Sequence, residues 1–334
     1  MTIQKMITYR KVWMGLAMLW IMLCHSAISI PFSGLIYVKI LGYGGVDIFL
    51  FASGIGNYFS YLRDESPLDF LKRRICRLAP TYVPFISLWC IVKVTWGGLD
   101  PLFIVGNIFG IQGFSSRGEY FNWYLTAIAI CYILTPYFAS FVKKNNLKNN
   151  FILVAILVLI STAFWNDTEM VITATRLPIY VIGMICAKCD DKPIFRKHAL
   201  VGALLCCFGF TLLALAYKFC SEYLWSYGLH WYPFIIITPF LCYVISLISA
   251  NFEKNNVLQV ILAAVKWIGT YSFEMFLVHV PVFQIAKNVV RKYEFFDNNL
   301  FWIIPFAMAF LCAYLLKYIS NGIKKKLSVT ARGK

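Results

Sequence analysis

The chain alternates long apolar stretches with short segments rich in lysine and arginine over its whole length. A helix needs roughly 20 mostly apolar residues to cross the hydrocarbon core of a bilayer. By this criterion ten spans are predicted, at residues 12–30, 42–62, 80–96, 121–142, 151–165, 171–188, 199–217, 231–250, 258–286 and 299–319. Residues 101–113 are short and broken by glycine, so we expect an interfacial or re-entrant segment there. No stretch is left for a soluble domain, and residues 1–334 are predicted to form a single all-α membrane domain.

Composition agrees with this pattern. The chain is 60% hydrophobic and 14% charged, whereas soluble domains are about 45–50% apolar and about 25% charged. The net charge of +16 would also suit a protein that binds nucleic acid. The basic residues, however, fall between apolar stretches and form no separate basic helix. We therefore expect a lipid bilayer, and no nucleic acid, as partner. Cys186 and Cys189 form a lone CxxC pair without a second pair or a nearby histidine, so no metal site is predicted.

The positions of lysine and arginine predict the orientation. Cytoplasmic segments carry an excess of these residues, and most of the 31 in this chain fall on one side when the N-terminus is placed in the cytoplasm. With ten spans, both termini are then cytoplasmic. The first apolar stretch follows basic residues as a signal peptide would, but no small-residue cleavage site follows it. We therefore predict an uncleaved first helix.

Polar side chains at a similar depth on four predicted spans indicate chemistry, because ionisable residues inside a membrane are costly and mark functional sites. A neutral imidazole is the usual general base near pH 7, and a carboxylate can orient it. His25 is therefore the predicted base and Asp47 its orienting group, while His279 and Arg176 are candidate supports for an acceptor or an oxyanion. The alternative for each histidine is a core residue hydrogen-bonded to a neighbouring helix.

Three further ionisable residues have weaker expectations. Glu274, also a candidate site residue, can pair with Lys266 or with a cation on another helix. His198 and His230 fall in predicted loops, and we expect both to be solvated.

A basic cluster precedes Pro80. Lys72, Arg73, Arg74 and Arg77 fall within six positions, and such side chains suit phosphate groups. The alternative is a topology signal that also attracts anionic lipid.

Six segments carry further patterns: MGLAMLWIMLCH (14–25), GGVDIFLFASG (44–54), FLKRRICRLAP (70–80), NWYLTAIAICYILTP (122–136), RLPIYVIGMICA (176–187) and YSFEMFLVHVPVF (271–283). In this order they resemble the motifs of acyltransferase family 3, a group of bacterial integral membrane acyltransferases. The resemblance implies transfer of an acyl group, usually acetyl, from cytoplasmic acyl-CoA to a carbohydrate on or facing the outer side. It implies acetyl-CoA as donor substrate without a resident cofactor, and a surface polysaccharide or lipid-linked oligosaccharide as acceptor at the bacterial plasma membrane.

The resemblance also implies roles for residues. His25 matches the first-helix histidine usually assigned to catalysis, and the run from Lys72 to Arg77 would face the CoA phosphates. Direct transfer and an acyl-histidine intermediate both stay open.

One position departs from the family pattern. Relatives carry arginine or lysine eleven residues before the histidine, where this chain has Met14. Lys11 lies one turn earlier on the same helix face and Arg10 is adjacent, so either long side chain can substitute. Two rival functions remain at this stage: a transporter or flippase for a lipid-linked glycan, and an acyltransferase-like assembly partner that has lost catalysis, which Met14 favours.

Overall fold

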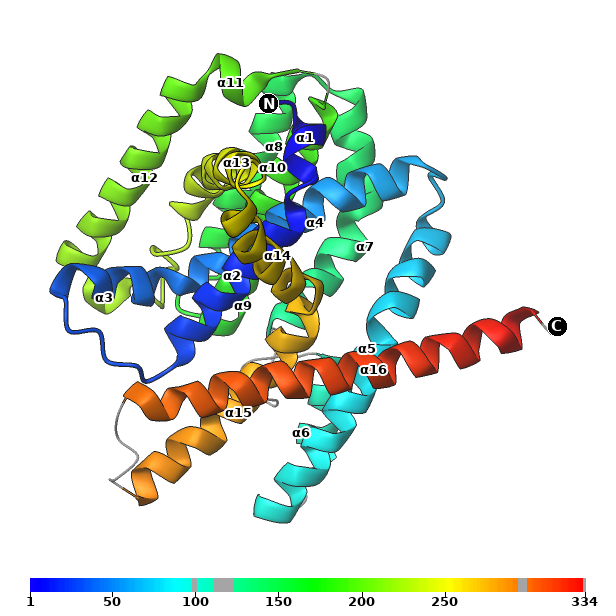
Figure 1. Cartoon of the computed structure of the whole chain (residues 1–334). Coiled ribbons are helices and arrows are strands. Elements are labelled where there is room, and N and C mark those ends of the chain that lie inside the picture. The colour runs from blue at the N-terminus through cyan, green and yellow to red at the C-terminus, as the bar shows by residue number, and fades with distance from the viewer. Residues whose placement is uncertain (98–100, 111–122, 191, 294–298, 333–334) are drawn as a thin grey trace.

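The computed structural model describes residues 1–97, 101–110, 123–190, 192–293 and 299–332 (Figure 1). Within these residues the structure is helical and contains no strand. The helices are α1 (Ile3–Ile7), α2 (Arg10–His25), α3 (Ser33–Ile40), η1 (Leu41–Gly44), α4 (Gly45–Leu62), α5 (Pro67–Gly97), α6 (Pro101–Phe109), α7 (Trp123–Lys144), α8 (Leu147–Thr162), α9 (Thr168–Ala174), α10 (Leu177–Lys188), α11 (Ile194–Lys197), α12 (Ala199–Phe219), η4 (Ser221–Tyr223), α13 (Phe234–Phe252), α14 (Asn256–Thr270), α15 (Ser272–Lys292), η6 (Asn299–Trp302) and α16 (Ile303–Arg332). Eight helical segments of the described chain are long and apolar enough to cross a membrane, which confirms the predicted all-α polytopic fold.

Two pairs of helices meet at glycines. A Cβ placed on Gly54 of α4 would lie 2.1 Å from a backbone oxygen of α10, and one on Gly183 of α10 would lie 2.4 Å from a backbone oxygen of α4. In the same way, a Cβ placed on Gly15 of α2 would lie 2.1 Å from a backbone oxygen of α14, and one on Gly269 of α14 would lie 1.8 Å from a backbone oxygen of α2. Small residues let the backbones of membrane helices approach closely. These contacts fix α2 and α4, which carry the predicted base and its predicted partner.

Helix α12 shows the lipid-facing side of the molecule. It lies at the edge of the bundle (Figure 1) and buries only Gly209 and Leu213. Most of its other apolar side chains, including Leu204 and Phe208, are exposed. A soluble monomer rarely exposes an apolar surface of this extent, so α12 is suited to contact with lipid.

The predicted span 258–286 is wrong as a single helix. It consists of α14 and α15, which are separated at Tyr271, where φ is −106° and ψ is 8°. These dihedral angles differ from the regular helical values. The break does not interrupt the apolar run, so hydropathy cannot locate it.

Two further boundaries differ from the prediction. The first span was predicted at 12–30, but α2 ends at His25 because Ser26 adopts an extended conformation. A later span was predicted at 80–96, but α5 already begins at Pro67 and includes the basic cluster. Of the predicted interfacial segment 101–113, residues 101–109 form α6, and residues 111–113 lie outside the described chain.

Candidate active site

A basic cavity of about 520 Å³ lies between the ends of several helices. Its cations come from three of them and are Arg10 and Lys11 of α2, Arg74 and Arg77 of α5, and Lys317 and Lys324 of α16. Among the described residues that line it, Glu274 is the one carboxylate, and its Oε2 lies 3.5 Å from Lys317 Nζ. One carboxylate cannot balance so many cations. The basic cavity is therefore suited to an anion with several charges.

Helical geometry selects which residues of the basic cluster reach this cavity. Arg74, Arg77 and Thr81 line it, and positions three and four apart share one face of a helix. Lys72 and Arg73 lie on other faces and are exposed. Arg73 Nη1 instead lies 2.8 Å from Asp64 Oδ2 at the surface. Of the four cations predicted to meet phosphates, the structure brings two into the cavity.

Arg74 is held in place by aromatic rings. Its guanidinium carbon lies 4.8 Å from the Phe70 ring centroid and 5.9 Å from that of Tyr132. The side chain is buried, and its Nε has no hydrogen-bond partner within the described chain. An unpaired buried donor is costly, so Arg74 has spare capacity to bind an anion.

Arg10 also reaches into the basic cavity. A Cβ on Gly56 of α4 would lie 3.2 Å from Arg10 Nη1, so the glycine leaves room for the guanidinium. Arg10 is partly buried, whereas Lys11 lines the cavity but is exposed. Met14 lies in the same lining. The start of α2 therefore contributes Arg10 as the more buried of its two cations, although Met14 occupies the position where the family pattern has a cation.

A second, smaller cavity of about 220 Å³ contains both membrane histidines and is called the histidine cavity. The rings of His25 and His279 meet edge to face, with centroids 5.2 Å apart. Its other lining residues are Trp123, Phe276, Val280, Phe283, Gln284 and Lys287. His25 is the last residue of α2, so the end of this helix places its imidazole at the cavity.

Hydrogen bonding identifies the tautomer of His279. Its Nδ1 lies 2.8 Å from the Phe276 carbonyl oxygen and 3.1 Å from that of Met275. A carbonyl oxygen only accepts, so Nδ1 carries the proton and Nε2 carries the lone pair. Nε2 is buried and has no partner within the described chain. His279 is therefore ready to accept a proton or a hydrogen bond in the cavity that it shares with His25.

Asp47 and Arg176 form a buried ion pair with each other. Arg176 Nη1 lies 2.8 Å from Asp47 Oδ1 and 2.6 Å from Oδ2, and both side chains are 1% exposed. The guanidinium carbon also lies 5.5 Å from the Trp123 ring and 5.2 Å from the Trp231 ring. Neither Asp47 nor Arg176 is among the described residues that line the histidine cavity. Trp123, which lines that cavity, contacts Arg176 and so connects the pair with it.

Glu274 has the second of its two predicted partners, a cation on another helix: its Oε2 lies 3.5 Å from Lys317 Nζ of α16, whereas Lys266 pairs with Glu253 at 3.0 Å. The expectation for His230 is wrong. His230 is not solvated: it is 1% exposed, and its Nδ1 lies 2.7 Å from the Leu224 carbonyl oxygen. Burial lowers the pKa of His230 to about 3, so the ring is neutral. His198 is exposed, as predicted.

The sequence reasoning missed several cavity residues. Lys317 and Lys324 are seven positions apart, which places them on one face of α16, but their positions in the sequence indicate only the orientation of the chain. Lys287 and Gln284 of α15 line the histidine cavity. Gln284 and Lys287 lie four and seven residues after Val280, another lining residue, and therefore share its helix face. This signal depends on knowing which face is inward.

A family model described as an acyltransferase domain matches residues 13–318, nearly the whole chain. No curated protein and no solved structure gives a significant match.

Proposed function

Because the chain belongs to the acyltransferase 3 family, we propose that it is a membrane O-acetyltransferase with acetyl-CoA as its donor. The acceptor is a hydroxyl group of a surface polysaccharide or a lipid-linked oligosaccharide, and the protein works in a bacterial plasma membrane with both termini in the cytoplasm. The family supports membrane acyl transfer. The choice of donor and acceptor rests on the arguments below.

One observation carries the proposal: α2 has Arg10 at one end and His25 at the other, and each lines a different cavity. A helix rises 1.5 Å per residue, so the two residues are about 22 Å apart along the axis. An acyl-CoA is an elongated molecule with phosphates at one end and a thioester at the other. The separation of Arg10 and His25 suits such a donor.

Arg10, Arg74 and Arg77 bind the CoA phosphates in the basic cavity, with Lys11, Lys317 and Lys324 around them. Guanidinium groups form paired, charge-assisted hydrogen bonds with phosphate oxygens. Lys72 and Arg73 have no place in this contact, because they lie on other faces of α5.

His25 removes the proton of the acceptor hydroxyl in the histidine cavity. The oxygen then bonds to the thioester carbon, the carbon–sulfur bond breaks, and the CoA thiolate leaves and takes up the proton. His279 supports this step, because its Nε2 can accept a hydrogen bond from the His25 ring and so orient it. Attack by the imidazole itself, giving an acyl-histidine, uses the same groups and stays open.

The direct test compares the glycans of three strains by mass spectrometry: wild type, a deletion strain, and the deletion strain carrying His25→Ala. We expect the acetyl mass to be lost in the second and absent in the third, with the variant present in the membrane. Unchanged glycans in the deletion strain, together with altered glycan translocation, would instead identify a transporter.

Donor binding is tested separately with CoA and the purified protein in nanodiscs. Arg74→Gln should weaken binding, whereas Arg73→Gln, the neighbouring residue outside the cavity, is the matched control and should leave it unchanged. Equal effects of the two changes would show that charge in general, and not the basic cavity, governs binding. A wild-type protein that binds no CoA would be a lapsed enzyme.

A further inference from the structure

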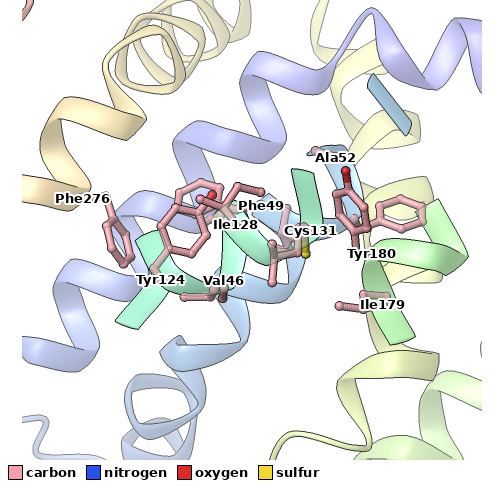
Figure 2. Close-up of a cluster of buried hydrophobic side chains, with 14 of the residues drawn as sticks. Val46, Phe49, Ala52, Tyr124, Ile128, Cys131, Ile179, Tyr180 and Phe276 are labelled. Carbon is pink, nitrogen blue, oxygen red and sulfur yellow. The ribbon is translucent and has the colours of Figure 1, made fainter. Parts of the chain in front are cut away.

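One aromatic ring from the lining of the basic cavity packs against one from the lining of the histidine cavity, and a third ring contacts both. Tyr124 belongs to the lining of the basic cavity and Phe276 to that of the histidine cavity. Their ring centroids are 4.6 Å apart, and Phe49 lies 6.3 Å from each of them. Figure 2 shows the Phe276 and Tyr124 rings next to one another. We call these three side chains the aromatic partition.

The partition stands where the two cavities come close to each other. On α7, consecutive residues line different cavities, Trp123 the histidine cavity and Tyr124 the basic cavity. On α15, Glu274 lines the basic cavity and Phe276 the histidine cavity. Two residues correspond to about 3 Å of helical rise. The two cavities are therefore neighbours.

The rings of the partition are buried and adjoin the reactive groups. Phe49, Tyr124 and Phe276 are all less than one-tenth exposed. The Phe276 ring centroid is also 5.5 Å from that of His279. A thioester that enters from the basic cavity therefore meets the partition before it reaches the imidazoles.

We propose that the aromatic partition sets the length of the acyl group that the site accepts, and that Phe276 is its main determinant. The inference rests on the proposed function, since it requires a thioester delivered from the basic cavity. An acetyl group carries one methyl beyond its carbonyl carbon, and a small rotation of the Phe276 ring admits it. Each added methylene needs space that the rings fill, and a closely packed interior has little to spare. The donors of this site are short-chain acyl thioesters.

The test uses S-ethyl-CoA and S-hexyl-CoA, stable thioethers that bind but cannot transfer a group. Their affinities for the protein in nanodiscs are measured by titration calorimetry. The wild type should bind the ethyl compound at least about tenfold more tightly, since one methylene in an apolar site changes selectivity by about 10–200-fold. Phe276→Ala should remove most of this preference, and Phe276→Leu should remove part of it if the alanine variant does not fold.

Phe51→Ala is the matched control. Phe51 is a fully buried phenylalanine of α4 that packs against Trp13 at 6.3 Å and lines neither cavity. It should keep the wild-type preference. If the Phe276 variants bind unmodified CoA normally and also keep that preference, the partition does not limit chain length and the inference is overturned.

Transfer assays separate this inference from the proposed function. A protein that shows the expected change in thioether preference, but never moves an acetyl group to glycan, would refute the proposed reaction and leave the length limit standing. A wild-type protein that binds neither thioether nor CoA overturns both.

Discussion

Arg10→Ala should weaken CoA binding far more than Lys11→Ala does. The two residues are neighbours at the start of α2 and carry the same charge, but Arg10 extends to within 3.2 Å of the position of a Cβ on Gly56, whereas Lys11 is exposed. An exposed charge is screened by water and ions. The two variants therefore remove the same charge from neighbouring positions, and a difference in CoA affinity reports the position of the side chain.

The size of the effect follows from the contact that is lost. A hydrogen bond to a charged group contributes about 1.5–3 kcal/mol, and about 1.4 kcal/mol is a factor of ten in affinity. We expect Arg10→Ala to raise the Kd for CoA by roughly 10–150-fold, and Lys11→Ala by less than about fivefold. Titration calorimetry with the purified variants in nanodiscs measures both.

A rescue experiment sharpens this prediction. Met14 lines the same cavity one turn further along α2, and residues four apart share a helix face. Met14→Arg, added to Arg10→Ala, should recover part of the lost affinity, because it returns a cation to the same face of α2. If Lys11→Ala raises the Kd for CoA and Arg10→Ala leaves it unchanged, Lys11 is the cation that contacts CoA, and our account of the basic cavity is wrong.

Three further predictions concern the histidines and the buried ion pair. His25→Ala and His279→Ala should each slow acetyl transfer, by about 10²–10⁴-fold for the base, at unchanged CoA affinity; loss of CoA affinity in either variant would place that histidine at the donor instead. Asp47→Ala should destabilise the protein by about 3–5 kcal/mol, because Arg176 is left buried and unpaired, and Asp47→Ala with Arg176→Leu should melt at a higher temperature than Asp47→Ala alone. Burial lowers the pKa of His230 from 6.5 to about 3, so the unfolded chain binds more protons than the folded protein between these pH values. The free energy of unfolding should therefore fall as the pH drops from about 6.5 towards 3. The melting temperature of His230→Phe should depend less on pH over this range.

The sequence was sufficient for the fold class because hydropathy reports the exchange of water for lipid, which dominates the placement of membrane helices. It was also sufficient to single out His25 and His279, since ionisable residues in apolar spans are few. Their convergence is confirmed by the shared cavity. What hydropathy does not contain is rotation about the helix axis.

That missing rotation explains the errors at the site. Arg73 and Arg74 are neighbouring arginines, and neither hydropathy nor the distribution of charge distinguishes them. Of the two, Arg74 faces the basic cavity. Asp47 was assigned to His25 because both were expected at the outer ends of neighbouring spans, but depth alone does not choose between partners. Arg176 shares that depth and offers the opposite charge, and Coulomb attraction in a low dielectric favours this partner strongly.

The break between α14 and α15 is the feature with the largest consequence for the site. It exposes the N-terminal turn of α15, including Ser272 and Glu274, to the basic cavity, where its free amide groups add positive potential. Lys317 holds the break, since its Nζ donates to the Thr270 carbonyl at the end of α14 and lies 3.5 Å from the Glu274 carboxylate in α15. A continuous helix over 258–286 would bury these amide groups in its own hydrogen bonds and would offer the cavity no helix end. The broken span therefore presents its positive end to the basic cavity while its next turn carries Phe276 and His279 to the histidine cavity. In the proposed reaction, these are the places of the donor phosphates and of the reacting carbon.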